Sequence, residues 1–204
     1  MFTPWVRFSP VTRGSTFRLH GANRNMTLEQ GNNHFIDTGS HYAYPLGPVL
    51  MTTQAEMHKQ LLGVTRTATL QVSIWSSALQ GGVFEHAGFL EVLKRFILAR
   101  RQARVRLLLS EAPDPYLQPR HPLIMLAERL PGTFDVRAVE QATLEAAELI
   151  ISDETAVLYR IHADRWDGVS NIRDPQVARF YLAQFNTSWR TALPVIPFSH
   201  SVGL

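Results

Sequence analysis

The feature that most constrains the fold is a strand, a helix and a second strand that follow one another directly along the chain. Residues 69–75 alternate between apolar and polar side chains, which predicts a strand. Residues 84–101 carry an apolar stripe at helical spacing, with acidic residues early and arginines late, as the helix dipole favours. Residues 104–109 are mostly apolar, which predicts a buried strand. Because two strands joined by a helix usually lie parallel in one sheet, this segment predicts an α/β protein.

The remaining elements extend this pattern on both sides. Similar spacing predicts helices at residues 54–65, 123–130 and 175–192, and strands at residues 133–139, 149–151 and 155–161. The early alternation favours a mixed, largely parallel sheet flanked by helices, with a hairpin near the end. Residues 1–51 are dense in proline and glycine and have no sustained period, which predicts an irregular or disordered, basic extension. We therefore expect an α/β domain at residues 52–193 and a C-terminal tail at residues 194–204.

Composition excludes several classes of protein. The chain has no cysteine, which excludes disulfide frameworks, cysteine nucleophiles and thiolate metal sites. The eight histidines lack the paired spacing of a zinc site, and no glycine-rich phosphate loop or Walker lysine occurs, so no metal and no cofactor is expected. No apolar run is long enough to span a bilayer, and the N-terminus lacks the apolar core of a secretory signal. A cytoplasmic location is the expectation.

Positive charge is concentrated at the N-terminus. Residues 1–28 carry four arginines and no acidic residue, whereas the whole chain has a net charge of only +3. The rest of the chain is therefore close to neutral, which gives only weak support to nucleic-acid binding. Two interpretations of the N-terminal segment stay open: a basic arm that contacts an anionic partner, or an artefact of the start site, since Met26 and Met51 are alternative starts.

The hairpin near the C-terminus carries the most specific motif. Leu149–Ile151 and Ala156–Tyr159 are apolar runs that flank the turn Ser152–Glu154, and the stretch Gly168–Asn171 follows. This arrangement resembles the catalytic half of the phospholipase D superfamily. The family places His-x-Lys-x-x-x-x-Asp across such a hairpin and Gly-Ser-x-Asn shortly after it. Residues 88–109, in which a helix with a basic end leads into a strand rich in Val, Arg and Leu, resemble the same family.

The resemblance implies a fold without its usual reaction. Alignment on Asp153 places Ala146 at the histidine and Glu148 at the lysine, and no other histidine lies between His121 and His162. Alanine cannot attack phosphorus, and a carboxylate repels the phosphate that the lysine would hold. We therefore expect no catalytic residue and no enzyme activity. The chain is most similar to a bacterial set of single-half, non-catalytic phospholipase D-like domains of unknown function.

Five residues are candidates for binding a phosphate-containing ligand. They are Arg160, Arg165, Ser170, Asn171 and His121. Three of them have a structural alternative: Arg165 can pair with a neighbouring acid, Asn171 can cap a turn, and a loop histidine such as His121 is usually solvated. Asp153 can likewise be a turn former without a functional role.

Three functions remain open at this point. The first is a non-enzymatic binding module that keeps an anion-binding cleft. The second is a scaffold or dimerisation protein without a ligand; active relatives pair two halves, so a single half predicts a homodimer or a partner protein. The third and weakest is an enzyme, either of another class with His121 or His162 as a base or a divergent phosphodiesterase-type hydrolase.

Overall fold

The computed structural model describes residues 47–77, 79, 82–110, 121–139 and 148–195. Contacts between Cα atoms divide the chain into Met1–Tyr42 and Ala43–Leu204, and every described residue belongs to the second unit. The expected N-terminal extension, apart from its last residues, and most of the C-terminal tail lie outside the described residues. The described residues form, in order, β1 (Val49–Met51), α1 (Gln54–Arg66), β2 (Gln71–Ser76), α2 (Ala87–Ala99), β3 (Arg104–Leu109), α3 (Pro122–Arg129), β4 (Phe134–Ala138), β5 (Glu148–Ser152), β6 (Ala156–Arg160), β7 (Gly168–Asn171), α4 (Pro175–Thr191) and β8 (Leu193–Pro194).

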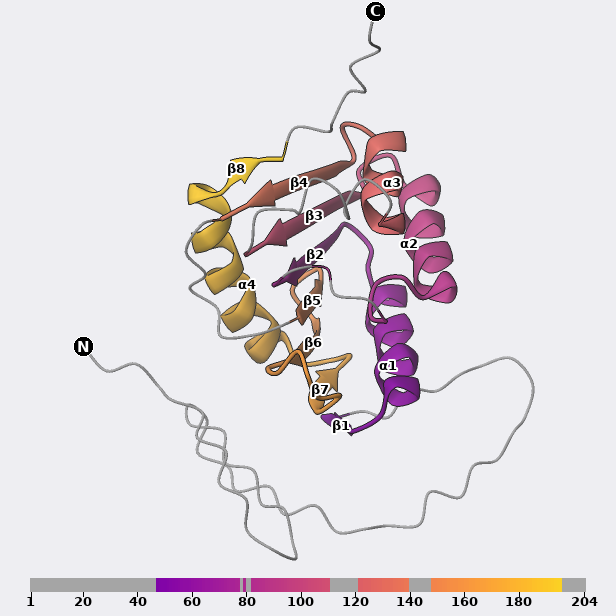
Figure 1. The fold of residues 1–204 in the computed structure, drawn as a ribbon, viewed down its shortest axis with the longest axis vertical. Coiled ribbons are helices and arrows are strands. Elements are labelled where there is room, and N and C mark those ends of the chain that lie inside the picture. Colours follow the sequence, from indigo (N-terminus) through magenta and orange to yellow (C-terminus); the bar gives the residue numbers. More distant parts are fainter. Residues whose placement is uncertain (1–46, 78, 80–81, 111–120, 140–147, 196–204) are drawn as a thin grey trace, which may run out of the picture. The chain divides into compact units, whose positions relative to one another are not determined.

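The strands form one sheet in the order β1-β7-β6-β5-β2-β3-β4-β8 (Figure 1). The expected α/β class with a mixed sheet flanked by helices is confirmed. Parallel pairing is confined to β2, β3 and β4, however, and the other five neighbouring pairs are antiparallel. The sheet is thus less parallel than the sequence indicated. Helices α2 and α3 supply the long crossovers that parallel strands need, whereas short connections join β5, β6 and β7 and require antiparallel pairing.

Every helix and strand expected from the sequence is present, but three short strands were missed. Strand β1 lies within the stretch expected to be irregular, and β8 crosses the expected end of the domain. They are the two outermost strands of the sheet and are too short to show an alternating pattern. Strand β7 was interpreted only as a motif, although it pairs with both β6 and β1.

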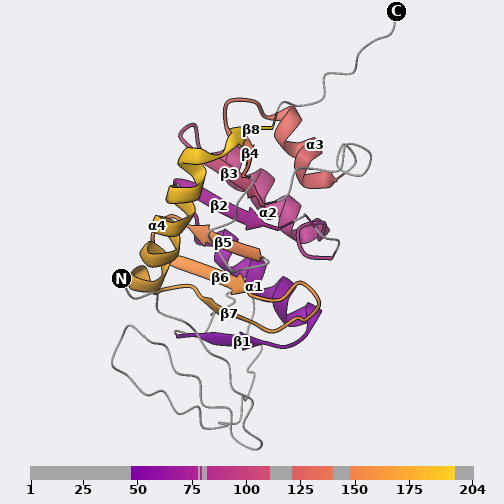
Figure 2. The same ribbon diagram turned by 60° about the vertical axis from the view of Figure 1, so that its left-hand side comes forward.

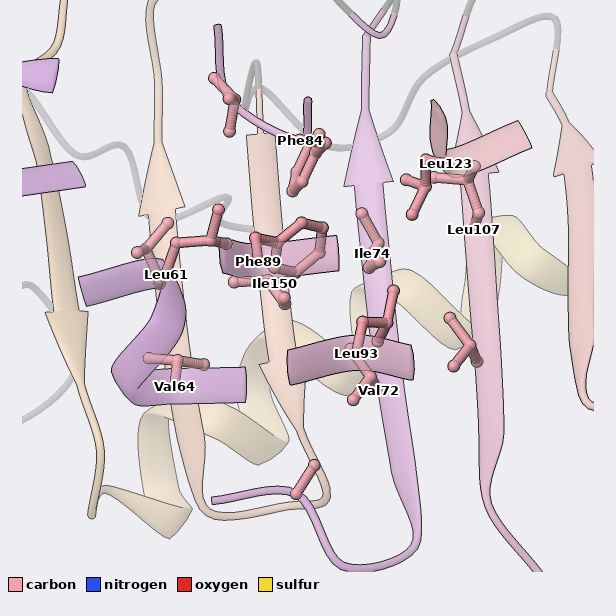
Figure 3. Packing of buried hydrophobic residues seen from close by; sticks show 14 of the residues in the cluster. Leu61, Val64, Val72, Ile74, Phe84, Phe89, Leu93, Leu107, Leu123 and Ile150 are labelled. Atoms are coloured by element: carbon pink, nitrogen blue, oxygen red, sulfur yellow. The ribbon is translucent and has the colours of Figure 1, made fainter. Parts of the chain in front are cut away.

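The helices lie in two layers. Figure 2 shows α1, α2 and α3 on one face of the sheet and α4 on the other. The first face carries the larger apolar core, in which Leu61, Phe89 and Leu93 pack against Ile74 and Ile150 (Figure 3). The second core includes Trp75, Leu108, Leu149, Phe185 and Trp189. Because successive side chains of a strand point to opposite faces, each sheet position can be assigned to the α1 face or to the α4 face.

Side chains fix the helix ends where the sequence indicated. Thr53 and Glu56 form a capping box at the start of α1. Asp174 caps α4 by accepting a hydrogen bond from the Val177 N–H, with Pro175 in the first turn. None of the helices in the described part of the chain is long and apolar enough to cross a membrane.

Candidate functional site

The topology divides the candidate residues between opposite edges of the sheet. We call the edge where β2, β3 and β4 end the carboxyl edge and the opposite one the amino edge. Strand pairing places Glu148 and Arg160 at the carboxyl edge, beside Ser76 at the end of β2. Asn171 lies at the amino edge, because it pairs with Val157 near the start of β6. The five predicted ligand-binding residues therefore do not form one pocket.

A buried ion pair occupies the carboxyl edge on the α1 face. Glu148 and Arg160 are register partners on β5 and β6, and Arg160 Nε donates to Glu148 Oε2 at 2.6 Å. The two side chains are only 1% and 3% exposed. Burial raises the pKa of Glu148, while the hydrogen bond and the charge of Arg160 oppose that rise. The other carboxylate oxygen, Oε1, is buried and has no hydrogen-bond partner.

The loop after β6 closes over this pair. Arg160 Nη1 donates to the carbonyls of Ala163 and Arg165, at 3.1 and 2.9 Å. The Trp166 ring lies against the guanidinium, with its centroid 4.9 Å from Cζ. Trp166 also packs close to Gly82, whose φ of +95° lies in the left-handed region. Arg160 is thus committed to internal contacts and not displayed to a ligand.

Arg165 is the exposed arginine of the same loop. Its guanidinium forms an ion pair with the carboxylate of Asp167, and both side chains remain largely solvated. This is the alternative in which Arg165 pairs with a neighbouring acid. Such exposed pairs contribute little to stability.

Histidines begin two helices at the carboxyl edge. His121 is buried, contrary to the expectation of a solvated loop residue, and its Nδ1 accepts the Leu123 N–H at the start of α3. His86 Nδ1 accepts the Phe89 N–H at the start of α2. Burial lowers the pKa of His121 against the effect of Glu85, and burial together with His58 lowers the pKa of His86. Both rings therefore act as neutral acceptors in helix caps.

The candidates away from the carboxyl edge have structural partners. Ser170 is buried on the α1 face, and its hydroxyl donates to Gln60 Oε1 at 3.0 Å. Asn171 Oδ1 accepts the Arg173 N–H at 3.1 Å, which is the turn-capping alternative. The Gly-x-Ser-Asn stretch therefore binds the end of the sheet to α1 and to the loop before α4.

Asp153 organises the amino edge. Its φ of +52° places it in the left-handed region of a tight turn, as a turn former tolerates. Its carboxylate accepts four hydrogen bonds of 2.7–2.8 Å: three from the N–H groups of Thr69, Leu70 and Gln71, and one from the Thr69 hydroxyl. Burial opposes ionisation, but these bonds prevail and hold the pKa of Asp153 below its ordinary value. The residue thus ties the hairpin to the start of β2.

Sequence reasoning missed the Glu148–Arg160 pair, although a signal was present. The two residues stand at equal distances from the centre of the turn, so a regular hairpin makes them direct partners. Reasoning residue by residue assigned Glu148 to a lost lysine and Arg160 to a ligand, and did not combine the two.

Comparison with solved structures identifies the class of fold. The chain is similar to Nuc from Salmonella typhimurium, a phospholipase D family member, with 12% identity, a TM-score of 0.53, and coverage of 73% of this chain and 99% of that one. NucT from Helicobacter pylori has 12% identity, a TM-score of 0.54 and the same coverage. TrmBL2, an archaeal chromatin protein with a novel mode of DNA binding, has 15% identity and a TM-score of 0.54. There the match covers 73% of this chain and only 55% of that one. The fold is therefore phospholipase D-like.

The sequence itself places the chain in a family. Residues 53–199 match the family described as Domain of unknown function (DUF7931), and the chain belongs to that family. The sequence matches none of the curated proteins.

Proposed function

We propose that this protein is a non-catalytic member of the phospholipase D-like fold that acts as a binding or interaction module. The observation that carries the proposal is the buried pair of Glu148 and Arg160. The resemblance in sequence assigns position 148 to a lysine that holds phosphate. A carboxylate there, already bonded to an internal arginine, presents no positive charge to a phosphodiester.

The other residues of the motif support the same conclusion. Asp153 and Ser170 are engaged in hydrogen bonds within the fold. Ala146 lies outside the described residues, but an alanine side chain has no nucleophilic atom wherever it is placed. His121, whose ring is buried, uses Nδ1 to cap α3. These structural roles support the proposal that the chain does not catalyse the family's reaction.

Assembly is the second part of the proposal. The matches to Nuc and NucT span almost the whole of those chains, so this chain contains one copy of the fold. A homodimer, or a complex with a partner protein, would cover apolar side chains such as Phe180 on α4, which is 52% exposed. Light scattering coupled to size-exclusion chromatography measures this directly. A monomer at all concentrations would contradict the homodimer.

A phosphodiesterase assay tests the central claim. Hydrolysis of bis(4-nitrophenyl) phosphate by the full chain is expected to equal the rate without protein. Turnover that rises with protein concentration and disappears in His121→Ala or His162→Ala would overturn the proposal. Those two variants separate turnover by this chain from that of a contaminating enzyme, because a contaminant would be unaffected by either substitution.

A further inference from the structure

Polar side chains gather at the amino edge of the sheet on the α4 face. Ser73, Arg106 and Asp135 are register partners on β2, β3 and β4 and form one cross-strand row. Gln71 and Arg104 pair in the row nearer the edge. A cavity of about 440 Å³ is lined by Gln71, Arg104, Arg106 and Asp135 together with the loop before β4. We call this region the β3 shelf; it lies at the opposite end of the strands from the Glu148–Arg160 pair.

Arg106 is the unusual member of the β3 shelf. Its Nη1 donates to Asn186 Oδ1 at 2.8 Å and its Nη2 to Ser73 Oγ at 3.0 Å, and both acceptors are neutral. Its Nε is buried without a hydrogen-bond partner. The guanidinium carbon lies 4.8 Å from the ring centroid of Phe185 and 5.3 Å from that of Trp189. A cation withdrawn from water is normally paired with an anion, and aromatic faces replace only part of that interaction.

The acidic residues near the β3 shelf are used elsewhere. Asp135 stands directly opposite Arg106, yet its carboxylate forms its ion pair with Arg137, at 3.3 Å. Asp153, at the same edge, accepts four hydrogen bonds from Thr69, Leu70 and Gln71. Burial and the neighbouring Arg137 lower the pKa of Arg106, with Asp135 opposing them, which agrees with a local surplus of positive charge.

We propose that the β3 shelf binds a small organic phosphate monoester, with Arg104 and Arg106 as the groups that hold its phosphate. The two residues lie on the same face of β3 two positions apart, roughly 7 Å along the strand, and both line the cavity. Arg104 Nη1 donates to the Ala103 carbonyl at 2.9 Å, and each Nη of Arg106 keeps one N–H beyond its bond to Asn186 or Ser73, so both guanidinium groups retain donors for one dianion. A guanidinium presents paired N–H donors that match phosphate oxygens. A cavity of this volume exceeds what phosphate alone needs and leaves space for an organic group. The inference rests on the proposed binding role and names its ligand class.

Calorimetric titration of the full chain at low salt with phenyl phosphate, inorganic phosphate and benzoate tests the inference. We expect saturable binding of phenyl phosphate, weaker binding of inorganic phosphate and the weakest binding of benzoate. Arg104→Gln should weaken phenyl phosphate binding about tenfold, and Arg106→Lys should weaken it as well, since lysine keeps the charge but loses the fork. Arg129→Gln is the control, because Arg129 is an exposed arginine at the end of α3 on the other face.

Different results would overturn the site and the ligand class. No saturable binding up to about 10 mM phenyl phosphate, or equal affinity in Arg104→Gln and Arg129→Gln, would overturn the site. Benzoate or inorganic phosphate binding as tightly as phenyl phosphate would overturn the ligand class. Arg104 is exposed, so its replacement leaves the core intact, and urea unfolding of each variant excludes loss of folding as the cause. Failure to bind would leave the expected absence of phosphodiesterase turnover unaffected.

Discussion

Removing either partner of the Glu148–Arg160 pair should destabilise the protein strongly. The loss of stability should depend on pH differently in the two single variants. Both side chains are almost completely buried and joined at 2.6 Å, so each single variant leaves the other group unpaired in the interior. Breaking such a pair costs about 3–5 kcal/mol, equivalent to roughly 10–15 °C in Tm for a protein of this size. We expect Glu148→Gln to fall in this range at any pH between 5 and 8, because the arginine left behind stays charged.

Arg160→Met should behave differently. The pKa of Glu148 is already raised by burial, and Arg160 opposes that rise, so removing Arg160 raises it further. The native variant then holds a proton that the unfolded chain releases above its ordinary carboxyl pKa, and stability relative to the wild type falls as pH increases from about 5 to 8. Near pH 5 the neutral acid is tolerated better and the loss is smaller.

Urea unfolding of the wild type, both single variants and the double variant Glu148→Gln/Arg160→Met measures these differences. At each pH, the free energy of unfolding of a variant is compared with that of the wild type, so contributions from all other titrating groups cancel. The double variant should recover much of the loss, because no charge is left unpaired. Losses below about 1 kcal/mol for both single variants would refute the reasoning and indicate that water reaches the pair.

Three further predictions concern other parts of the fold. The pKa values of His86 and His121 are lowered in the folded protein, so the unfolded chain binds more protons below pH 6.5 and stability should decline from pH 7.5 to 5.5. The double variant His86→Asn/His121→Asn keeps the cap acceptors and should make the free energy of unfolding in urea depend less on pH, whereas an unchanged dependence would exclude the two rings as its source. Asp153→Ala should cost about 2–3 kcal/mol of stability at pH 7 by the same measurement, since four donors lose their acceptor. Because the pKa of Asp153 is held low, the wild type should lose its greater stability over the variant only as pH falls below 3.8, and a cost below about 0.5 kcal/mol at pH 7 would contradict the structural role of this carboxylate. Gly82→Ala should cost more than Gly132→Ala in thermal unfolding, because both positions have positive φ but only the first places a new Cβ 3.0 Å from Gln54 and 3.3 Å from Trp166; equal costs would show that the Trp166 contact yields freely.

The sequence predicted the architecture far better than the site. Long periodic segments such as α2 and β3 can be predicted from the sequence because their burial pattern repeats over several turns or pleats. The three-residue β1 and the two-residue β8 carry no period, and their pairing depends on edges that only the assembled sheet supplies. The parallel share was overestimated because alternation along the chain was given more weight than the short connections of β5, β6 and β7.

The candidate residues were chosen by chemical type, and tertiary structure decided their use. Arg160 and His121 were singled out as polar groups near a strand end or in a loop, but one has a buried carboxylate partner and the other caps a helix. Arg106 was overlooked because its neighbours in β3 are apolar and the strand was interpreted as core. Arg106 is unusual because two aromatic rings lie against it and no carboxylate among the described residues pairs with it. The order of residues along the chain shows neither feature.

The pairing of positions 148 and 160 also constrains how this lineage can change. A lysine at position 148 beside an unchanged Arg160 would place two cations face to face in the protein interior and destabilise the fold strongly. The arginine would have to disappear first, and that step is itself harmful. Such reciprocal epistasis means that either position can change without a loss of stability only when the other changes with it.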